Sequence, residues 1–340
     1  MELSHEFQTF IHSLPTTITT TNLSDVREKA KFITPLSISN DDIPENFNKM
    51  SVVILQNLLN YHDDNEMFPI SSLKLLLDLI GTFDISDSIT KSKLMLLLHG
   101  TKLKLSSERL CSWFVKVKLM KEMIIDDTHE HLNRWKTLAS LTLNHPIVIG
   151  VINSLATNGT GICLPNIPPS IQVEIIDCTL AGLRGFCGIN KIYINAAYIR
   201  SQISTYSTIY HPDSPIGKSV VEMDICTIAI HEFGHARLRQ ITNNPNTCTP
   251  DLFNSVACST VNERSEFGRL CKMIFFFDQI DYWQSAADNK WDLDYFQQYI
   301  KAIESSSAIP PFNSTNNYIK RFPSTTSGLD IDLTADDYYV

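Results

Sequence analysis

The chain has 340 residues, of which 43% are hydrophobic and 19% are charged, and its formal net charge is -9 at pH 7. This composition is that of a globular protein, and the length has room for one or two domains. The negative charge argues against nucleic-acid binding through bulk electrostatics, and no segment has the ~20 consecutive apolar residues that span a membrane.

The N-terminal sequence and the cysteines favour a cytoplasmic protein. Residues 1–6 lack the basic region and apolar core of a signal peptide. The eight cysteines are scattered and none forms a CxxC pair, which is typical of reduced, buried thiols and not of a disulfide framework. We therefore expect a cytoplasmic protein, and the sequence leaves its oligomeric state open.

Residues 1–145 are predicted to form a helical N-terminal region. After a stretch rich in Ser, Thr and Asn, apolar residues recur at helical spacing from Met50 to about Leu143. The helical segments are expected at 52–59, 73–79, 94–98, 107–124 and 135–143. We interpret this region as a helical bundle that supports or covers the rest of the chain.

Residues 146–340 are predicted to form a second domain that begins with a small β-sheet. Apolar and polar residues alternate with a period of two in Ile171–Ile176 and in Lys191–Asn195, as they do in half-buried strands. Leu183–Gly188, with its two glycines, is a third expected strand. A polar loop is expected from Ser201 to Lys218.

Two helices are predicted after this loop. The first begins at a capping box, Ser219–Glu222, and stops before Asn243. The second runs from near Asn262 to Phe277. With the N-terminal helices, these elements give an α+β fold, in which a helical region precedes a small sheet packed on two helices.

The first of these helices carries His231-Glu232-Phe233-Gly234-His235, the HExxH pattern of zinc hydrolases. Side chains four residues apart lie on the same face of a helix, so His231 and His235 can direct two imidazoles at one point. Zinc binds imidazole nitrogen readily and prefers four tetrahedral ligands. Glu232 follows the first ligand and would act as the general base that activates a zinc-bound water.

The order of sheet, HExxH helix, loop and helix resembles the zincin metallopeptidases. The resemblance covers roughly residues 146–280, and its one specific motif is the pentapeptide His231–His235. It implies one catalytic Zn²⁺ and the hydrolysis of peptide bonds, so the substrate would be a peptide or a protein. In zincins the edge strand before the motif helix often binds substrate as an added strand, and here Lys191–Asn195 would be that strand.

The branch of the zincins follows from the third ligand. The metzincin pattern HExxHxxGxxH is excluded, because Leu238 stands where its Gly should be and Ile241 where its third His should be. The gluzincin branch takes a Glu from a downstream helix, and Glu263 and Glu266 are both candidates. The chain therefore resembles the gluzincin branch.

The two candidate glutamates have different sequence contexts. Glu263 follows Asn262, as in the Asn-Glu pair of thermolysin-type peptidases, but Phe267 stands where an acidic residue is expected. Glu266 lies two residues before Gly268, and a glycine there would let the two helices approach closely. We favour Glu266 as the third ligand and keep Glu263 as the alternative.

Two further points stay open. A donor for the developing oxyanion is expected in an amide hydrolase, and Tyr206, Tyr210, His211 and Tyr282 are candidates by their position in loops. The alternative to an enzyme is a non-catalytic helical interaction protein with a degenerate or structural metal site.

Overall fold

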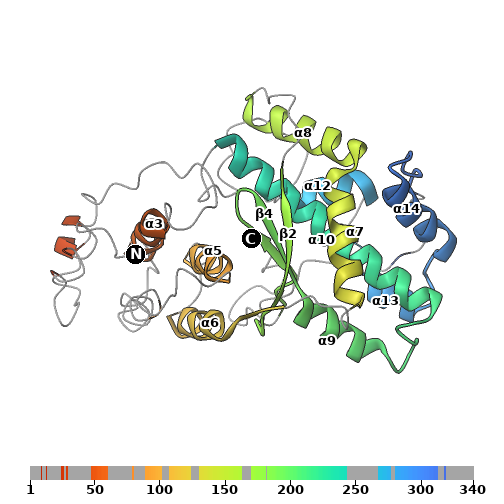
Figure 1. Cartoon of the computed structure of the whole chain (residues 1–340), viewed down its shortest axis with the longest axis horizontal. Coiled ribbons are helices and arrows are strands. Elements are labelled where there is room, and N and C mark those ends of the chain that lie inside the picture. The colour runs from red at the N-terminus through yellow and green to blue at the C-terminus, as the bar shows by residue number, and fades with distance from the viewer. Residues whose placement is uncertain are drawn as a thin grey trace. The chain divides into compact units, whose positions relative to one another are not determined.

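The computed structural model describes residues 9, 13, 24–26, 28–29, 47–59, 79, 89–101, 107–123, 130–162, 170–180, 182–242, 267–276, 280–312 and 318 (Figure 1). The chain divides into two compact units. The first contains Met1–Glu122 with Asn243–Asn246, and the second contains Met123–Thr242 with Thr247–Val340.

The described part of the first unit is helical, as the sequence predicts. It contains α3 (Phe47–Leu59), α5 (Thr90–Gly100) and α6 (Ser107–Leu119), and it ends in the two-residue strand β1 (Lys121–Glu122). Helix α5 packs against both α3 and α6, and its leucines are fully buried. The indole Nε1 of Trp113 on α6 donates a hydrogen bond of 3.0 Å to the carbonyl of Leu96 on α5. The predicted segment 73–79 lies outside the described residues apart from Leu79.

The sheet of the second unit contains the three predicted strands. They are β2 (Gln172–Asp177), β3 (Gly185–Cys187) and β4 (Lys191–Asn195). Strand β4 lies between the other two and pairs parallel to β2 and antiparallel to β3. Because β4 is paired on both sides, the expectation that Lys191–Asn195 is an edge strand is wrong. The strand that lies beyond β4 in this sheet is β3.

Helix α10 (Pro215–Thr242) is the centre of the second unit. It packs against the sheet and against five other helices (Figure 1). These are α7 (Glu130–Asn144), α8 (Pro146–Thr160), α12 (Phe267–Phe276), α13 (Tyr282–Ala287) and α14 (Leu293–Ser305). Helix α7 thus belongs to this unit, whereas the sequence grouped it with the N-terminal helices.

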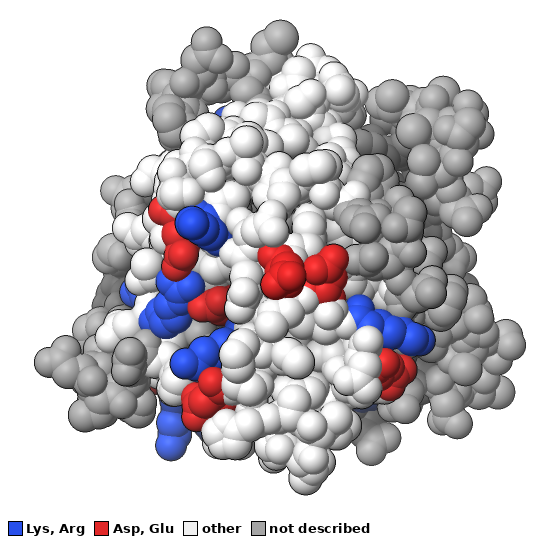
Figure 2. All heavy atoms as spheres, turned by 90° about the vertical axis from the view of Figure 1, so that its right-hand side faces the viewer, with Lys and Arg blue, Asp and Glu red and all other residues white. Residues whose placement is uncertain are grey.

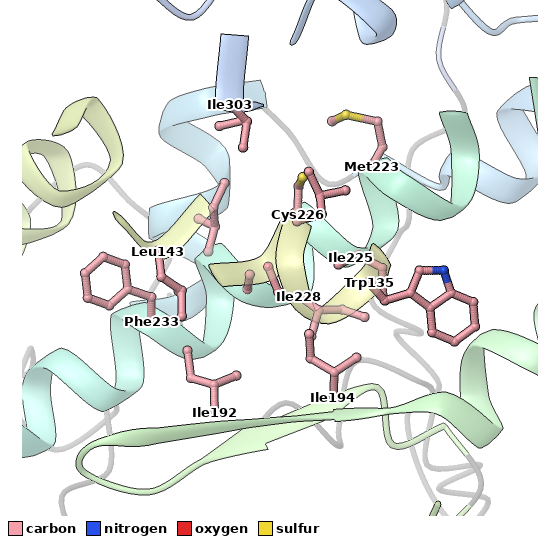
Figure 3. Close-up of a cluster of buried hydrophobic side chains, with 14 of the residues drawn as sticks. Trp135, Leu143, Ile192, Ile194, Met223, Ile225, Cys226, Ile228, Phe233 and Ile303 are labelled. Atoms are coloured by element: carbon pink, nitrogen blue, oxygen red, sulfur yellow. The ribbon is translucent and has the colours of Figure 1, made fainter. Parts of the chain in front are cut away.

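The apolar core of the unit forms on several sides of α10 (Figure 3). Ile192 and Ile194 project from β4 toward α10, where Ile228 lies in the same cluster. On another side, Cys226 of α10 and Ile303 of α14 contribute to the core. Burial of apolar side chains on several faces explains why α10 has no strongly polar face. It also means that polar residues on α10 lie inside the protein.

Helix α10 begins earlier in the chain than the sequence predicted. Helix α10 begins at Pro215, because the hydroxyl oxygen of Ser214 accepts a hydrogen bond of 3.1 Å from the backbone N–H of Gly217. A serine cap followed by proline at the first helical position is a strong start signal. The predicted start at Ser219 is therefore wrong by about one turn.

Two more helices replace segments that were not predicted to be helical. Residues expected to open the loop at Ser201 belong to α9 (Ala196–Tyr206), which the side chain of Asn195 caps by accepting from the N–H of Ala197. Helix α8 begins at Pro146 and is capped by the imidazole of His145, which accepts from the N–H of Ile147. Both starts again pair a polar cap with the first residues of a helix.

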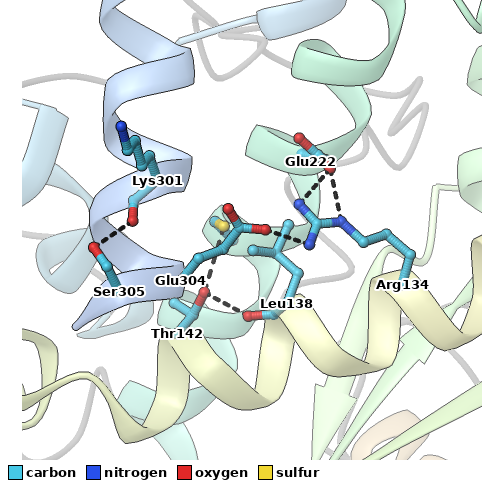
Figure 4. Close-up of polar contacts among 8 residues, drawn as sticks. Arg134, Leu138, Thr142, Glu222, Lys301, Glu304 and Ser305 are labelled. Carbon is cyan, nitrogen blue, oxygen red and sulfur yellow. Dashed lines mark hydrogen bonds and ion pairs between the residues drawn. The ribbon is translucent and has the colours of Figure 1, made fainter.

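A polar cluster ties α10 to its neighbours α7 and α14 (Figure 4). Arg134 of α7 donates from Nε to Glu222 of α10 at 2.8 Å and also forms an ion pair with Glu304 of α14. Below it, the hydroxyl of Thr142 lies 3.4 Å from the sulfur of Cys226. Three helices that are far apart in sequence are thus joined by one guanidinium group.

The side of the molecule that carries α14 shows a mixed charge pattern (Figure 2). Basic and acidic side chains lie next to one another there, and the described residues on this face form no large area of a single sign.

No single helix among the described residues has the length and apolar composition of a membrane span. One pair of helices, His131–Asn144 with Pro146–Asn158, meets those two criteria when the two are taken together. The two helices of this pair are bent by 58° relative to each other. Both helices of this pair pack against α10.

Candidate functional site

The three residues of the pentapeptide that carry chemistry lie inside the second unit. His231 is 1% exposed, Glu232 is fully buried and His235 is 5% exposed. The two imidazole rings lie on adjacent turns of α10, with their centroids 5.0 Å apart and their planes at 62°. The structure therefore places both rings together on one side of the helix, as the four-residue spacing predicts.

The backbone of α12 approaches His231 closely. A β-carbon added to Gly268 would lie only 2.7 Å from Nδ1 of His231. On α10, a β-carbon added to Gly234 would lie 2.9 Å from the sulfur of Cys271. The ring of His231 leaves no room for a methyl group at position 268, whereas a methyl group at position 234 would press on the end of the Cys271 side chain. The close approach expected from Gly268 is confirmed.

Strand β3 approaches the same helix beside Glu232. A β-carbon added to Gly185 would lie 2.8 Å from Cγ2 of Ile228 and 3.4 Å from Cγ of Glu232. The same β-carbon would lie 2.9 Å from the backbone oxygen of Tyr193 on β4. Glu232 thus lies against the backbone of β3, the strand beyond β4 in the sheet.

Contacts with α10 hold β3 at both of its ends. Before the strand, Arg184 forms a buried ion pair with Asp224, and their side chains are 4% and 0% exposed. After Gly185, at the other end of the strand, Arg239 of α10 donates to the carbonyl and to the sulfur of Cys187. The short strand is therefore fixed along the helix over the segment that contains the motif.

The ion pair between Arg184 and Asp224 is part of a larger buried network. The second carboxylate oxygen of Asp224 accepts a hydrogen bond of 2.8 Å from Nε1 of Trp283 on α13. The guanidinium of Arg184 lies 5.4 Å from the ring centre of Tyr198, a cation–π distance. The sequence did not predict this network, because its members come from four separate segments. The polar residue Asp224 within an apolar helix was the one signal available.

Five of the eight cysteines lie within the described residues. Among the described residues, Cys178, Cys187, Cys226 and Cys271 are buried and Cys111 is partly buried, and none of these five forms a disulfide. Burial raises the pKa of Cys226 to about 12 and outweighs the opposing hydrogen bond with Thr142. The Cys226 thiol is therefore neutral at physiological pH.

The tyrosines proposed as oxyanion donors have other partners. Tyr206 donates to Gln284 at 3.1 Å, and the hydroxyl of Tyr210 lies 3.5 Å from the carbonyl of Trp283. Tyr282 is buried, forms a hydrogen bond with Thr227, and has a pKa raised by burial. Tyr206 and Tyr210 thus contact residues of α13, and Tyr282 contacts Thr227 of α10. The fourth candidate, His211, is exposed.

The candidate third ligands, Glu263 and Glu266, lie outside the described residues. Within the part of the chain that the structure describes, no cluster of three or more His, Cys, Asp or Glu side chains is arranged to hold a metal ion. The choice between Glu263 and Glu266 therefore stays a prediction.

The separation of the two imidazole rings can be compared with that expected at a zinc ion. Two imidazoles bound to one tetrahedral zinc ion at ~2.0–2.1 Å have ring centroids about 5 Å apart. The observed separation of 5.0 Å agrees with this value. The separation is thus compatible with two imidazoles on one ion, and edge-to-face packing of two rings gives the same separation.

Comparison with known protein families, with characterised proteins and with solved structures finds no significant match.

Proposed function

We propose that the second unit is a zinc-dependent hydrolase of peptide bonds that resembles the gluzincin metallopeptidases. His231 and His235 would bind the metal, and Glu266, or alternatively Glu263, would be the third protein ligand. The observation that carries the proposal is the pair of buried imidazoles, 5.0 Å apart on one side of α10, with Glu232 next to them in the chain.

The position of Gly268 supports a third ligand from the segment before α12. Gly268 lies in contact with the His231 ring, and Glu266 precedes it by two residues. Two residues of extended chain span at most ~7 Å, so the carboxylate of Glu266 has a short path to the two imidazoles. Carboxylate oxygen is a normal zinc ligand.

Zinc held by these residues would polarise the scissile carbonyl and lower the pKa of a water molecule. Glu232 would accept a proton from the attacking water while the oxygen of that water bonds to the carbonyl carbon of the substrate. Glu232 would then give that proton to the amine that leaves when the C–N bond breaks. The contact of Glu232 with the backbone at Gly185 would limit the positions that its carboxylate adopts.

A second candidate function is favoured by the burial of the three side chains. None of them is more than 5% exposed, so a peptide reaches Glu232 only if the surrounding chain moves. A structural or degenerate metal site in a non-catalytic helical interaction protein would need no such access. Metal binding without hydrolysis would identify this alternative.

Replacement of the general base separates the two candidates. We expect Glu232→Gln to retain zinc and to lose activity on a mixed peptide library by about 100-fold or more, because an amide cannot accept the proton. Glu222→Gln is a matched control, since Glu222 lies on the same helix and pairs with Arg134. Turnover by Glu232→Gln near that of the wild type would rule out the mechanism, and a zinc-loaded wild type without turnover would favour the structural site.

A further inference from the structure

The contact between Gly268 and His231 involves a particular part of the imidazole. A β-carbon added to Gly268 would lie 2.7 Å from Cγ, 2.7 Å from Nδ1 and 2.8 Å from Cδ2 of His231. A point in the ring plane at this range cannot be equally distant from three neighbouring ring atoms. The backbone of Gly268 therefore packs on the face of the ring.

A contact on the face has a specific consequence for metal binding. An imidazole binds a metal through a nitrogen lone pair that lies in the plane of the ring. Packing on the face therefore fixes the plane of the ring without occupying a ligand position. Outer contacts that orient a metal-binding histidine contribute strongly to metal affinity.

We infer that Gly268 is a positioning residue for His231, and that α12 holds the imidazole in the plane in which it binds zinc. This inference rests on the proposed zinc site. It adds that a single methyl group at position 268, on a residue that is not itself a ligand, turns the ring and weakens the metal site.

Gly234 is the natural comparison for Gly268. It lies at the same helix crossing, and a β-carbon there would lie 2.9 Å from the sulfur of Cys271 and 3.2 Å from Cδ1 of Phe267. Neither of those side chains is a proposed ligand. Alanine at position 234 and alanine at position 268 therefore crowd the same pair of helices, but only the second presses on a zinc-binding ring.

The first experiment measures zinc affinity by competition with a chelator in the wild type, Gly268→Ala and Gly234→Ala. We expect Gly268→Ala to weaken zinc binding by about 10- to 100-fold, in the range found for outer-contact changes at metal sites. Gly234→Ala should weaken it much less. Cobalt substituted for zinc should show an altered visible absorption spectrum in Gly268→Ala and a wild-type spectrum in Gly234→Ala.

The second experiment tests the ring contact without metal, by thermal unfolding in the presence of a chelator. Gly268→Ala should lower Tm in the wild-type background and should lower it much less in the His231→Ala background, because removal of the ring removes the obstacle. If Gly268→Ala alone does not fold, the double variant should fold. An equal loss of Tm in both backgrounds would overturn the inference.

The outcomes separate this inference from the proposed function. A wild type that binds no zinc would contradict both the inference about Gly268 and the proposed function. A wild type that binds zinc, with Gly268→Ala and Gly234→Ala equal in affinity and in cobalt spectrum, would end the inference and leave the zinc site standing.

Discussion

The two halves of α10 meet their neighbours in different ways. In the first half, buried or partly buried acidic residues are met by side chains, since Asp224 pairs with Arg184 and Glu222 pairs with Arg134. In the second half, the backbone of glycine residues lies against the motif, with Gly185 beside Glu232 and Gly268 on the face of His231.

This difference suggests that the two halves of α10 have different roles. Ion pairs between separate elements fix the position of α10, and the buried pair of Arg184 and Asp224 makes it costly to remove either partner. Glycine brings a backbone within contact distance of a side chain and adds no side chain of its own. The first half of α10 would thus provide a stable support, and the second half would confine the side chains of the motif.

The largest effect on stability is expected from Asp224→Ala. This change leaves the buried guanidinium of Arg184 without its carboxylate and removes the acceptor of Trp283, so it should lower the free energy of unfolding by about 3–5 kcal/mol. Urea-induced unfolding followed by tryptophan fluorescence measures it. Asp213→Ala, at an exposed position, is the control and should change stability by no more than ~0.5 kcal/mol. A loss at Asp224 as small as that of the control would contradict the supporting role of this half.

A smaller effect is expected where glycine backbone meets the motif. Gly185→Ala should lower the free energy of unfolding by about 1–3 kcal/mol, because its methyl group would press on the backbone oxygen of Tyr193 and on Ile228. Gly150→Ala is the matched control, since no heavy atom lies within 4 Å of its added β-carbon and it lies inside α8. Alanine there should stabilise the protein by up to ~1 kcal/mol. If the Tm of both variants changes in the same direction, close packing at Gly185 is not the cause of the change.

The smallest effect is expected from Cys226, in the first half of the helix. Its pKa is raised from 9.0 to about 12 by burial, so above pH 9 the unfolded state loses this proton while the folded state keeps it. Stability should therefore fall as pH rises, by about 1 kcal/mol between pH 9 and pH 10. Cys226→Ala should lose less stability over this interval when urea unfolding is measured at both pH values. The same slope in both proteins would show that the thiol is not responsible.

The sequence predicted those parts of the fold that depend on local pattern. The period-two alternation located β2 and β4, and the long apolar run located α10 and its end. The order of the strands was not accessible in this way, because β4 pairs with strands on both sides and pairing is decided by tertiary contacts. A polar residue followed by proline also signals the helix starts at Pro146 and Pro215, and the prediction did not include them.

The candidate site was predictable to a similar extent. The spacing of His231 and His235 fixed their common side of the helix, and Gly268 indicated the close approach of α12. The contact of Gly185 with Glu232 was not predictable, since it depends on how β3 lies along α10. The same holds for the pair of Arg184 and Asp224, which are 40 residues apart in the chain.

The central claim is that the second half of α10, which carries His231 and His235, holds a zinc ion. The zinc content of the purified protein tests this claim most directly. After loading with zinc and dialysis, the wild type should retain about one equivalent by mass analysis. His231→Ala and His235→Ala should each retain far less, because too few protein ligands remain. His131→Ala, at an exposed position on α7, should match the wild type. A wild type that retains well under one equivalent, or a His231→Ala variant that retains as much as the wild type, would contradict the account.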